Sequence, residues 1–251
     1  MAPVEVGARL GYFWQEWRNE GADYWVVQQL RRGLSWTFLS PPSLSPTPIP
    51  FHVNNPVKLT LIQEHIDKLL LKQAIEPVNP PYGMGFYSLI FLTPKKNGEL
   101  RPIIDLSALN RSIDCPTFLM ESAQSVRDLL SAGQWVASID LKDAYLHVPI
   151  RRSFRKYLRF ALEGKVWQFR CLPFGLSIAP WAFTKIMAAV GSMLRLKGVQ
   201  IHMYLDDWLI RNFSRTSLKN DVHLSMNPVS YTHLTLPTNV QQCRSRWSPY
   251  H

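Results

Sequence analysis

The sequence predicts an α+β fold in which helices and strands alternate irregularly, without a strict βαβ order. Short apolar runs bounded by Asn-Gly, Glu-Gly and Asp-Asp dipeptides are typical of hairpin strands. Longer stretches place apolar residues at helical spacing, which is typical of amphipathic helices. The 251 residues are 46% hydrophobic and 18% charged, a composition that favours a globular protein over a disordered tail.

The N-terminal part predicts a lead-in and a linker. Apolar residues follow helical spacing from residue 10 to 17, and a second short helix is expected after the N-cap candidate Asp23. Residues 40–56 carry six prolines, which exclude a regular helix and favour an extended connector. We therefore divide this part into a helical lead-in, residues 1–39, and a proline-rich linker, residues 40–56.

The next region predicts a helix and then a growing sheet. Thr60 and Gln63 form a capping-box pair at the start of an amphipathic helix that stops before Pro77. Residues 87–105 predict a β-hairpin that turns at Asn97-Gly98. Further helices are expected at residues 122–130 and 180–196, and further strands at residues 135–139, 157–162, 166–169, 201–204 and 208–210.

Charge and cysteine content narrow the function classes. The formal net charge of +10 favours a polyanionic partner, either nucleic acid or an anionic membrane. The membrane is the weaker option, because no apolar run has the length that crosses a bilayer and no signal-peptide pattern opens the chain. The three cysteines lie far apart without zinc-ligand spacing, so we expect reduced structural thiols and an intracellular protein.

Three aspartates are the candidate catalytic and metal-binding residues. Asp140 ends an apolar strand, and Asp206 and Asp207 lie at the turn of a predicted hairpin. Carboxylate oxygens suit Mg²⁺ or Mn²⁺, and two such ions can hold the attacking and leaving oxygens of a phosphoryl displacement. The alternatives are a solvated β-turn for the aspartate pair and a helix N-cap for the single aspartate.

The order of four motifs resembles that of a reverse transcriptase. They are residues 95–105 (KKNGELRPIID), 138–145 (SIDLKDAY), 172–180 (LPFGLSIAP) and 204–208 (YLDDW). The resemblance covers roughly residues 55–212 and implies the fingers and palm of a right-hand polymerase, with an antiparallel palm sheet backed by helices. Residues 7–10, residues 25–27 and Trp208 look most like the DIRS-type, tyrosine-recombinase retrotransposons.

The resemblance implies an RNA-directed DNA polymerase whose partners are a primed RNA or DNA template and dNTPs. Asp140 and Asp206 would bind two Mg²⁺ or Mn²⁺ ions, Asp207 would support the pair, and the carbonyl of Leu141 would complete a coordination shell. Lys96 and Arg101 resemble the fingers residues that hold the incoming triphosphate, where fixed cations offset developing negative charge. The alternative for the last two is an exposed charged hairpin.

The resemblance also implies roles in nucleotide selection. Tyr145 matches the aromatic steric gate that selects deoxynucleotides, while Asp143 and Ala144 shape the same pocket. Core packing for Tyr145 and a helix cap for Asp143 are the alternatives. Phe174 departs from retroviral enzymes, which have Gln there, and this change removes an amide contact to the nucleotide.

Template and primer contacts are expected at three residues. Gly175 would allow close backbone approach in the segment that lies against the template base. Arg155 and Lys156 belong to a run of five cations in residues 151–159, whose aromatic residues alternate with the charges as in a strand. Such a run is suited to template phosphates, and the alternative is an ordinary solvated face.

The C-terminal part departs from the family pattern. Residues 213–228 resemble the start of a connection to the thumb, and neither a thumb nor a ribonuclease H domain has room after it. Residues 229–239 (VSYTHLTLPTN) resemble adapter DNA read as coding, so residues 229–251 are predicted to be a non-native tail. Besides a polymerase fragment with weak template binding, the sequence leaves open a catalytically inactive nucleic-acid-binding remnant and a carboxylate-metal nuclease.

Overall fold

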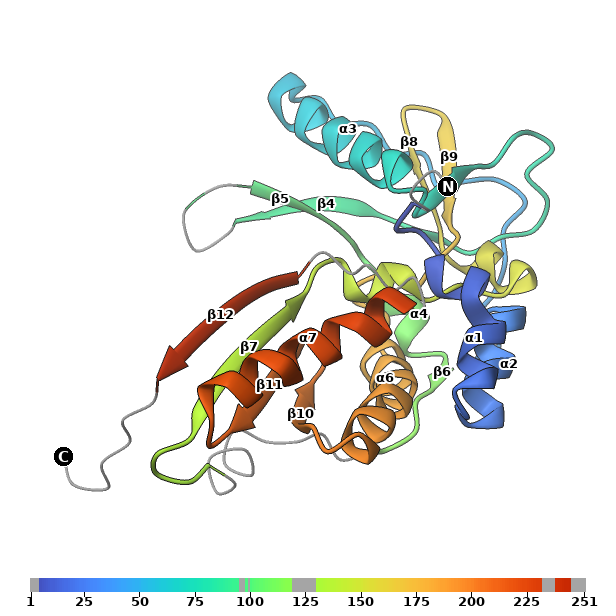
Figure 1. The fold of residues 1–251 in the computed structure, drawn as a ribbon. Coiled ribbons are helices and arrows are strands. Elements are labelled where there is room, and N and C mark those ends of the chain that lie inside the picture. Colours follow the sequence, from blue (N-terminus) through green and yellow to red (C-terminus); the bar gives the residue numbers. More distant parts are fainter. Residues whose placement is uncertain (1–4, 95–97, 99, 119–129, 232–237, 245–251) are drawn as a thin grey trace. The chain divides into compact units, whose positions relative to one another are not determined.

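The computed structural model describes residues 5–94, 98, 100–118, 130–231 and 238–244 (Figure 1). The chain forms two compact units. The first contains residues 1–12, 29–116 and 145–179, and the second contains residues 13–28, 117–144 and 180–251. The predicted lead-in is therefore shared between the units, and the boundary passes through helix α2 (Tyr24–Arg32).

A four-stranded antiparallel sheet forms the centre of the second unit. Its order is β10 (Gln200–Tyr204), β11 (Asp207–Asn212), β7 (Trp135–Leu141) and β12 (Thr238–Arg244). Side chains alternate along β7, so that Ala137, Ile139 and Leu141 are buried while Ser138 and Asp140 are exposed. This period of two places one face of the sheet on the core and the other toward solvent.

Helices cover this sheet within the second unit. Helix α7 (Arg215–Tyr231) packs against β11 and β7 (Figure 1). Helix α6 (Ala179–Leu196) approaches β10 closely at Gly191, where an added Cβ would meet the sulfur of Met203. The short helix α1 (Trp14–Asn19) contributes the buried Trp17.

A second four-stranded sheet lies in the first unit. Its order is β2 (Ile75–Pro77), β9 (Lys165–Phe169), β8 (Arg159–Leu162) and β3 (Tyr87–Ser88), with β3 parallel to β8. Strands β8 and β9 turn at Glu163 and Gly164, both with positive φ, as a type I′ hairpin requires. The turn predicted from this dipeptide is confirmed.

Helix α3 (Pro56–Leu71) packs on the hairpin of β4 (Ile90–Pro94) and β5 (Leu100–Ile104) in the same unit. The predicted capping box is wrong. Asn55 is the N-cap, because its side chain accepts from the Lys58 amide at 3.0 Å, and Pro56 is the first helical residue. Proline favours this position, since its missing N–H would have had no partner in the first turn. Thr60 instead donates to the carbonyl of Pro56 from within the helix.

The remaining elements are short. The first unit has the strand pair β1 (Thr37–Phe38) and β6 (Ile113–Asp114), helix α4 (Ser107–Asn110) and the 3-10 helix η3 (Arg152–Tyr157). The boundary between the units passes through the 3-10 helix η2 (Ala144–His147) after its first residue. A further 3-10 helix, η1 (Arg9–Phe13), precedes α1. Among the described residues, no helix is long and apolar enough to cross a membrane.

Several predictions of local structure need correction. The predicted hairpin over residues 87–105 is formed only by β4 and β5, because β3 pairs with β8 instead. The predicted strand that begins at residue 157 starts at Arg159, since the preceding residues form η3. The predicted helix at residues 122–130 lies almost wholly outside the described residues, as do Lys96 and Asn97 of the predicted turn.

Candidate active site

The three predicted carboxylates lie together in the second unit. Asp140 is an exposed residue near the end of β7, and Asp207 is the first residue of β11. The antiparallel register places these two residues directly opposite each other. Asp206 precedes Asp207 in the turn, and its carbonyl accepts from the Leu141 amide at 2.9 Å. The pairing of these two strands thus brings Asp140 to the same end of the sheet as the consecutive residues Asp206 and Asp207, far along the sequence.

The hairpin that carries the aspartate pair is held by a tight turn and a buried anchor. Tyr204 pairs with Asp207, so only Leu205 and Asp206 form the turn. Leu205 has a φ of 52°, a left-handed conformation that a leucine adopts only when the surrounding structure enforces it. Trp208, directly after the aspartates, is 1% exposed and anchors the strand in the core.

The electrostatics of the site show that the carboxylates repel one another. The pKa of Asp207 is raised above its ordinary value, first by burial and then by the negative charges of Asp206 and Asp140. Within the described parts of the chain, no three His, Cys, Asp or Glu side chains are arranged as a formed metal site. An oxygen-only donor set with mutual repulsion nevertheless fits a hard divalent cation, which would relieve that repulsion.

Residues expected to shape the nucleotide pocket fall on both sides of the boundary between the units. Asp143, with a φ of 57°, and the buried Ala144 belong to the second unit. Tyr145 belongs to the first unit, where its ring contacts that of Phe174 at 4.9 Å between centroids. Phe174 is 55% exposed and Tyr145 is half-buried, so this aromatic pair lies between the core and the surface.

The segment of residues 172–180 is held by a residue that the sequence reasoning missed. The Asn110 side chain donates to the carbonyl of Gly175 at 2.8 Å and accepts from the Ser177 amide at 2.8 Å. One amide therefore satisfies a backbone acceptor and a backbone donor of the loop. The signal in the sequence is an asparagine at the last position of a short helix, a pattern too common to indicate this contact.

Gly175 has a backbone conformation that favours glycine. Its φ of 88° is one that an L side chain rarely adopts. An added Cβ would meet no described atom within 4 Å, so the conformation of the backbone, and not lack of space, explains the glycine. Cys171, just before this loop, is buried, and burial raises the pKa of its thiol to about 12.

The predicted triphosphate contacts are only partly described. Arg101 lies on β5 with an exposed side chain, and its Nε is 3.4 Å from the hydroxyl of Thr93 on the paired strand β4. Lys96 lies outside the described residues, so the expected pair is represented by Arg101 alone.

The run of cations at residues 151–159 is not one solvated face. Arg159 is 8% exposed and donates to Gln168 and to the carbonyl of Tyr82. Arg155 donates to both carboxylate oxygens of Glu76 at 3.1 Å. Lys156 lies over the ring of Tyr157, with its Nζ 5.3 Å from the ring centroid. The expected strand-like alternation is wrong, because Arg152–Tyr157 is a 3-10 helix whose side chains point in several directions.

Aspartates gathered at one end of two paired antiparallel strands are typical of metal-dependent nucleotidyl transfer. The family model described as reverse transcriptase (RNA-dependent DNA polymerase) matches residues 93–239. The chain belongs to this family.

Relatives come from retroelements and viruses. The retrovirus-related Pol polyprotein from transposon 412 of Drosophila melanogaster is 26% identical over 166 residues, which cover 63% of this chain and 13% of the polyprotein. The Pol polyprotein of equine infectious anemia virus (strain Wyoming) is 26% identical over 164 residues, covering 61% of this chain and 14% of that protein. The chain therefore spans about one seventh of the length of these relatives.

A solved structure supports the fold. The crystal structure of prototype foamy virus protease-reverse transcriptase has a TM-score of 0.59 and 20% sequence identity. The match covers 80% of this chain and 25% of that one. The predicted α+β class is confirmed, and the fold is that of a retroviral reverse transcriptase over this part of the chain.

Proposed function

We propose that this chain is the fingers and palm of a retroelement polymerase that copies a primed RNA or DNA template from dNTPs. The observation that carries the proposal is the register that sets Asp140 opposite Asp207, beside Asp206, in a chain of the reverse transcriptase family. The basic balance of the chain supports a nucleic acid partner.

In this proposal the primer 3′-hydroxyl attacks the α-phosphorus of a dNTP, and the bond to pyrophosphate breaks. Asp140 and Asp206 would hold two Mg²⁺ or Mn²⁺ ions, with Asp207 in support and the carbonyl of Leu141 as a further ligand. When bound, such ions lower the pKa of the hydroxyl and neutralise the charge of the leaving pyrophosphate. The carboxylates of this chain supply the negative charge that selects hard cations.

The experiment compares the wild-type chain with Asp206→Asn in primer extension on an RNA template with Mg²⁺ and dNTPs. Extension should be lost in the variant while binding of the hybrid stays nearly unchanged, because the change removes a metal ligand and no phosphate contact. Equal extension by both proteins would overturn the proposal. Binding without extension by the wild type would favour the alternative, a catalytically inactive nucleic-acid-binding remnant, and turnover without dNTPs would favour a nuclease.

Nucleotide selection is assigned to Tyr145, Asp143 and Ala144, and triphosphate contact to Lys96 and Arg101. Phe174 is assigned to the nucleotide pocket. The contact between the rings of Tyr145 and Phe174 supports a shared role. We expect Tyr145→Ala to raise the ratio of ribonucleotide to deoxynucleotide incorporation, because the smaller side chain leaves room for a 2′-hydroxyl. The ratio is measured by extension with each nucleotide set, and an unchanged ratio would reduce this ring to a packing role.

Template contact remains assigned to Gly175, Arg155 and Lys156. The two cations differ in their contacts. Arg155 forms an ion pair with Glu76, whereas among the described residues the Lys156 side chain contacts only the Tyr157 ring. Lys156 is thus the better placed of the two cations for a direct phosphate contact, and Arg155 acts through its neighbours.

We further propose a DIRS-type origin, residues 213–228 as the start of a connection to a thumb, and residues 229–251 as a non-native tail. The free thiols of Cys115 and Cys171 support a reducing, intracellular location. A contiguous genomic read tests origin and tail together. For a DIRS-type origin, we expect the read to contain a tyrosine recombinase gene nearby. For a non-native tail, we expect it to encode a different sequence after residue 228. A read that encodes residues 229–251 unchanged would contradict the tail assignment.

A further inference from the structure

A polar hollow of about 580 Å³ lies in the first unit, away from the three aspartates in the sequence. It is formed by β2 and the residues after it, by β9 and the residue after it, and by η3. Three arginines and one carboxylate are its charged residues: Arg152, Arg155, Arg170 and Glu76.

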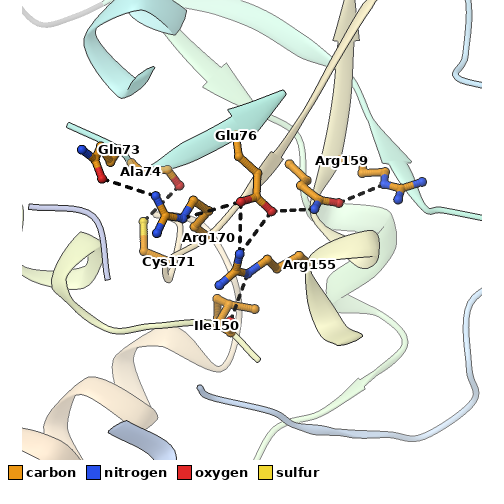
Figure 2. A network of polar contacts seen from close by, with 9 residues as sticks. Gln73, Ala74, Glu76, Ile150, Arg155, Arg159, Arg170 and Cys171 are labelled. Atoms are coloured by element: carbon orange, nitrogen blue, oxygen red, sulfur yellow. Dashed lines mark hydrogen bonds and ion pairs between the residues drawn. The ribbon is translucent and has the colours of Figure 1, made fainter. Parts of the chain in front are cut away.

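Glu76 is the centre of the polar network that forms this hollow (Figure 2). Arg155 Nη1 lies 3.1 Å from each of its carboxylate oxygens. Gln168 Nε2 donates to Glu76 Oε1 at 2.7 Å, and Arg170 Nε lies 3.6 Å from Oε2. The side chains of Arg155, Arg170 and Glu76 are 18%, 24% and 30% exposed, so the network is partly shielded from water. One carboxylate thus orients two arginines but balances only one of their charges.

The hollow keeps an excess of positive charge. Arg170 Nε is buried and has no hydrogen-bond acceptor among the residues that the structure describes, and its Nη1 reaches Gln73 Oε1 only at 3.4 Å. Arg152 is exposed, and within the described part of the chain its guanidinium has neither an ion-pair partner nor a hydrogen-bond acceptor. Three guanidinium groups against one carboxylate leave a formal charge of about +2 in one concave, partly shielded place, where screening by salt is weaker than on an open surface.

We infer that this hollow is a phosphate-binding site, in which Arg152 and Arg170 hold the phosphate and the Glu76–Arg155 pair acts as a rigid frame. Guanidinium groups match the geometry of phosphate oxygens and bind them through short, charge-assisted hydrogen bonds. Gln168 and the Glu76–Arg155 ion pair already restrict the arginine side chains. The arginines therefore lose less conformational entropy when phosphate binds. Glu76 and Arg155 are positioning residues here, because they act through their neighbours.

Two sources can supply the phosphate, either the backbone of a bound nucleic acid or a free phosphate. The nucleic acid source rests on the proposed function and extends it, because it adds a contact of the first unit to the template or primer. The phosphate site itself does not depend on catalysis, so its test uses binding and not turnover.

The test compares the full chain with Arg152→Gln, and with Arg18→Gln as the matched control. Arg152 and Arg18 are both exposed arginines, but Arg18 lies on α1 outside the hollow. Binding of a fluorescent RNA–DNA hybrid is measured from 50 to 300 mM salt, a range of about sixfold chosen to give a slope. In parallel, the linewidth of inorganic phosphate is followed by ³¹P NMR as protein is added.

For a backbone phosphate, Arg152→Gln should weaken hybrid binding by about tenfold and lower the salt slope by about 1, whereas Arg18→Gln leaves both unchanged. For a free phosphate, the broadening of the ³¹P signal should be lost in Arg152→Gln while the hybrid slope is unchanged. Wild-type behaviour of Arg152→Gln in both measurements overturns the site.

A second variant tests the role of Glu76 as part of the frame. Glu76→Gln keeps the shape of the side chain but removes the ion pairs that orient Arg155 and Arg170, so phosphate or hybrid should bind more weakly if the protein remains folded by circular dichroism. Tighter binding by folded Glu76→Gln would show that Glu76 is only a counter-charge and would contradict its role as the frame. Asp206→Asn separates this inference from the proposed function, because its hybrid binding and salt slope should equal those of the wild type even where extension is absent.

Discussion

At the scale of single residues, Asp207 is placed where its charge costs stability. Its pKa is raised by burial and by the charges of Asp206 and Asp140, and like charges directly opposite in a sheet are destabilising. The folded state therefore binds this proton more tightly than the unfolded state. The contribution of the carboxyl to stability is complete below its ordinary pKa of 3.8 and is lost as the pH rises through the raised value.

We expect Asp207→Asn to raise the free energy of unfolding at pH 7, in the absence of divalent ions, by on the order of 0.5 kcal/mol. The gain should be smaller at pH 4 than at pH 7, because the raised pKa makes the folded state take up the Asp207 proton before the unfolded state does, and protonation removes the repulsion. Urea unfolding of the wild type and the variant at pH 7 and pH 4 measures this change in the free energy of unfolding. The exposed Asp114 provides the control, and a gain equal at both pH values would show that charge is not its cause.

Asn110 illustrates how one side chain can hold a loop of proposed function. It bonds the carbonyl of Gly175 and the amide of Ser177, both at 2.8 Å. We expect Asn110→Ala to lower the free energy of unfolding by about 1–2 kcal/mol, because two backbone groups lose their partner. Chymotrypsin should cleave faster after the exposed Phe174 in this variant, as measured by mass spectrometry of the fragments. The exposed Asn54, changed to alanine, should leave the cleavage rate unaltered.

At the scale of elements, helix α3 shows which local signal determines a helix start. The predicted start at Thr60 satisfied the spacing of a capping box, but Asn55 followed by Pro56 offers a cap and a first residue already in helical φ. The N-cap therefore lies five residues earlier, at Asn55 instead of Thr60, because the earlier start adds a full turn of hydrogen bonds.

The cap provides a direct test of this explanation. We expect Asn55→Ala to lower the free energy of unfolding by about 1 kcal/mol, since the Lys58 amide loses its acceptor. Asn54→Ala, one residue earlier, should change it by no more than a few tenths. The two variants are compared by urea unfolding. Equal values would mean that the side chain of Asn55 does not cap the helix in solution.

At the scale of the whole molecule, charge is the property that the sequence reports most directly. With a formal net charge of +10, the chain should bind nucleic acid with strong salt dependence. We expect the affinity for an RNA–DNA hybrid to fall by roughly tenfold or more between 50 and 200 mM salt, because bound cations displace counterions from the phosphates. Fluorescence anisotropy measures the slope, and an affinity independent of salt would contradict phosphate binding altogether.

The α+β class, the strands that carry Asp140 and Asp207, the turn that carries Asp206 and the family can all be predicted from the sequence, because hairpin turns, strand alternation and short ordered motifs are local signals. Contacts between distant segments are known only from the fold. Strand β3 pairs with β8 and not with the next strand, Asn110 reaches a loop more than sixty residues later, and Glu76 collects arginines from two distant elements. Each of these contacts depends on which distant segments the fold brings together. The hydrophobic periodicity of one segment does not identify the segment with which it pairs.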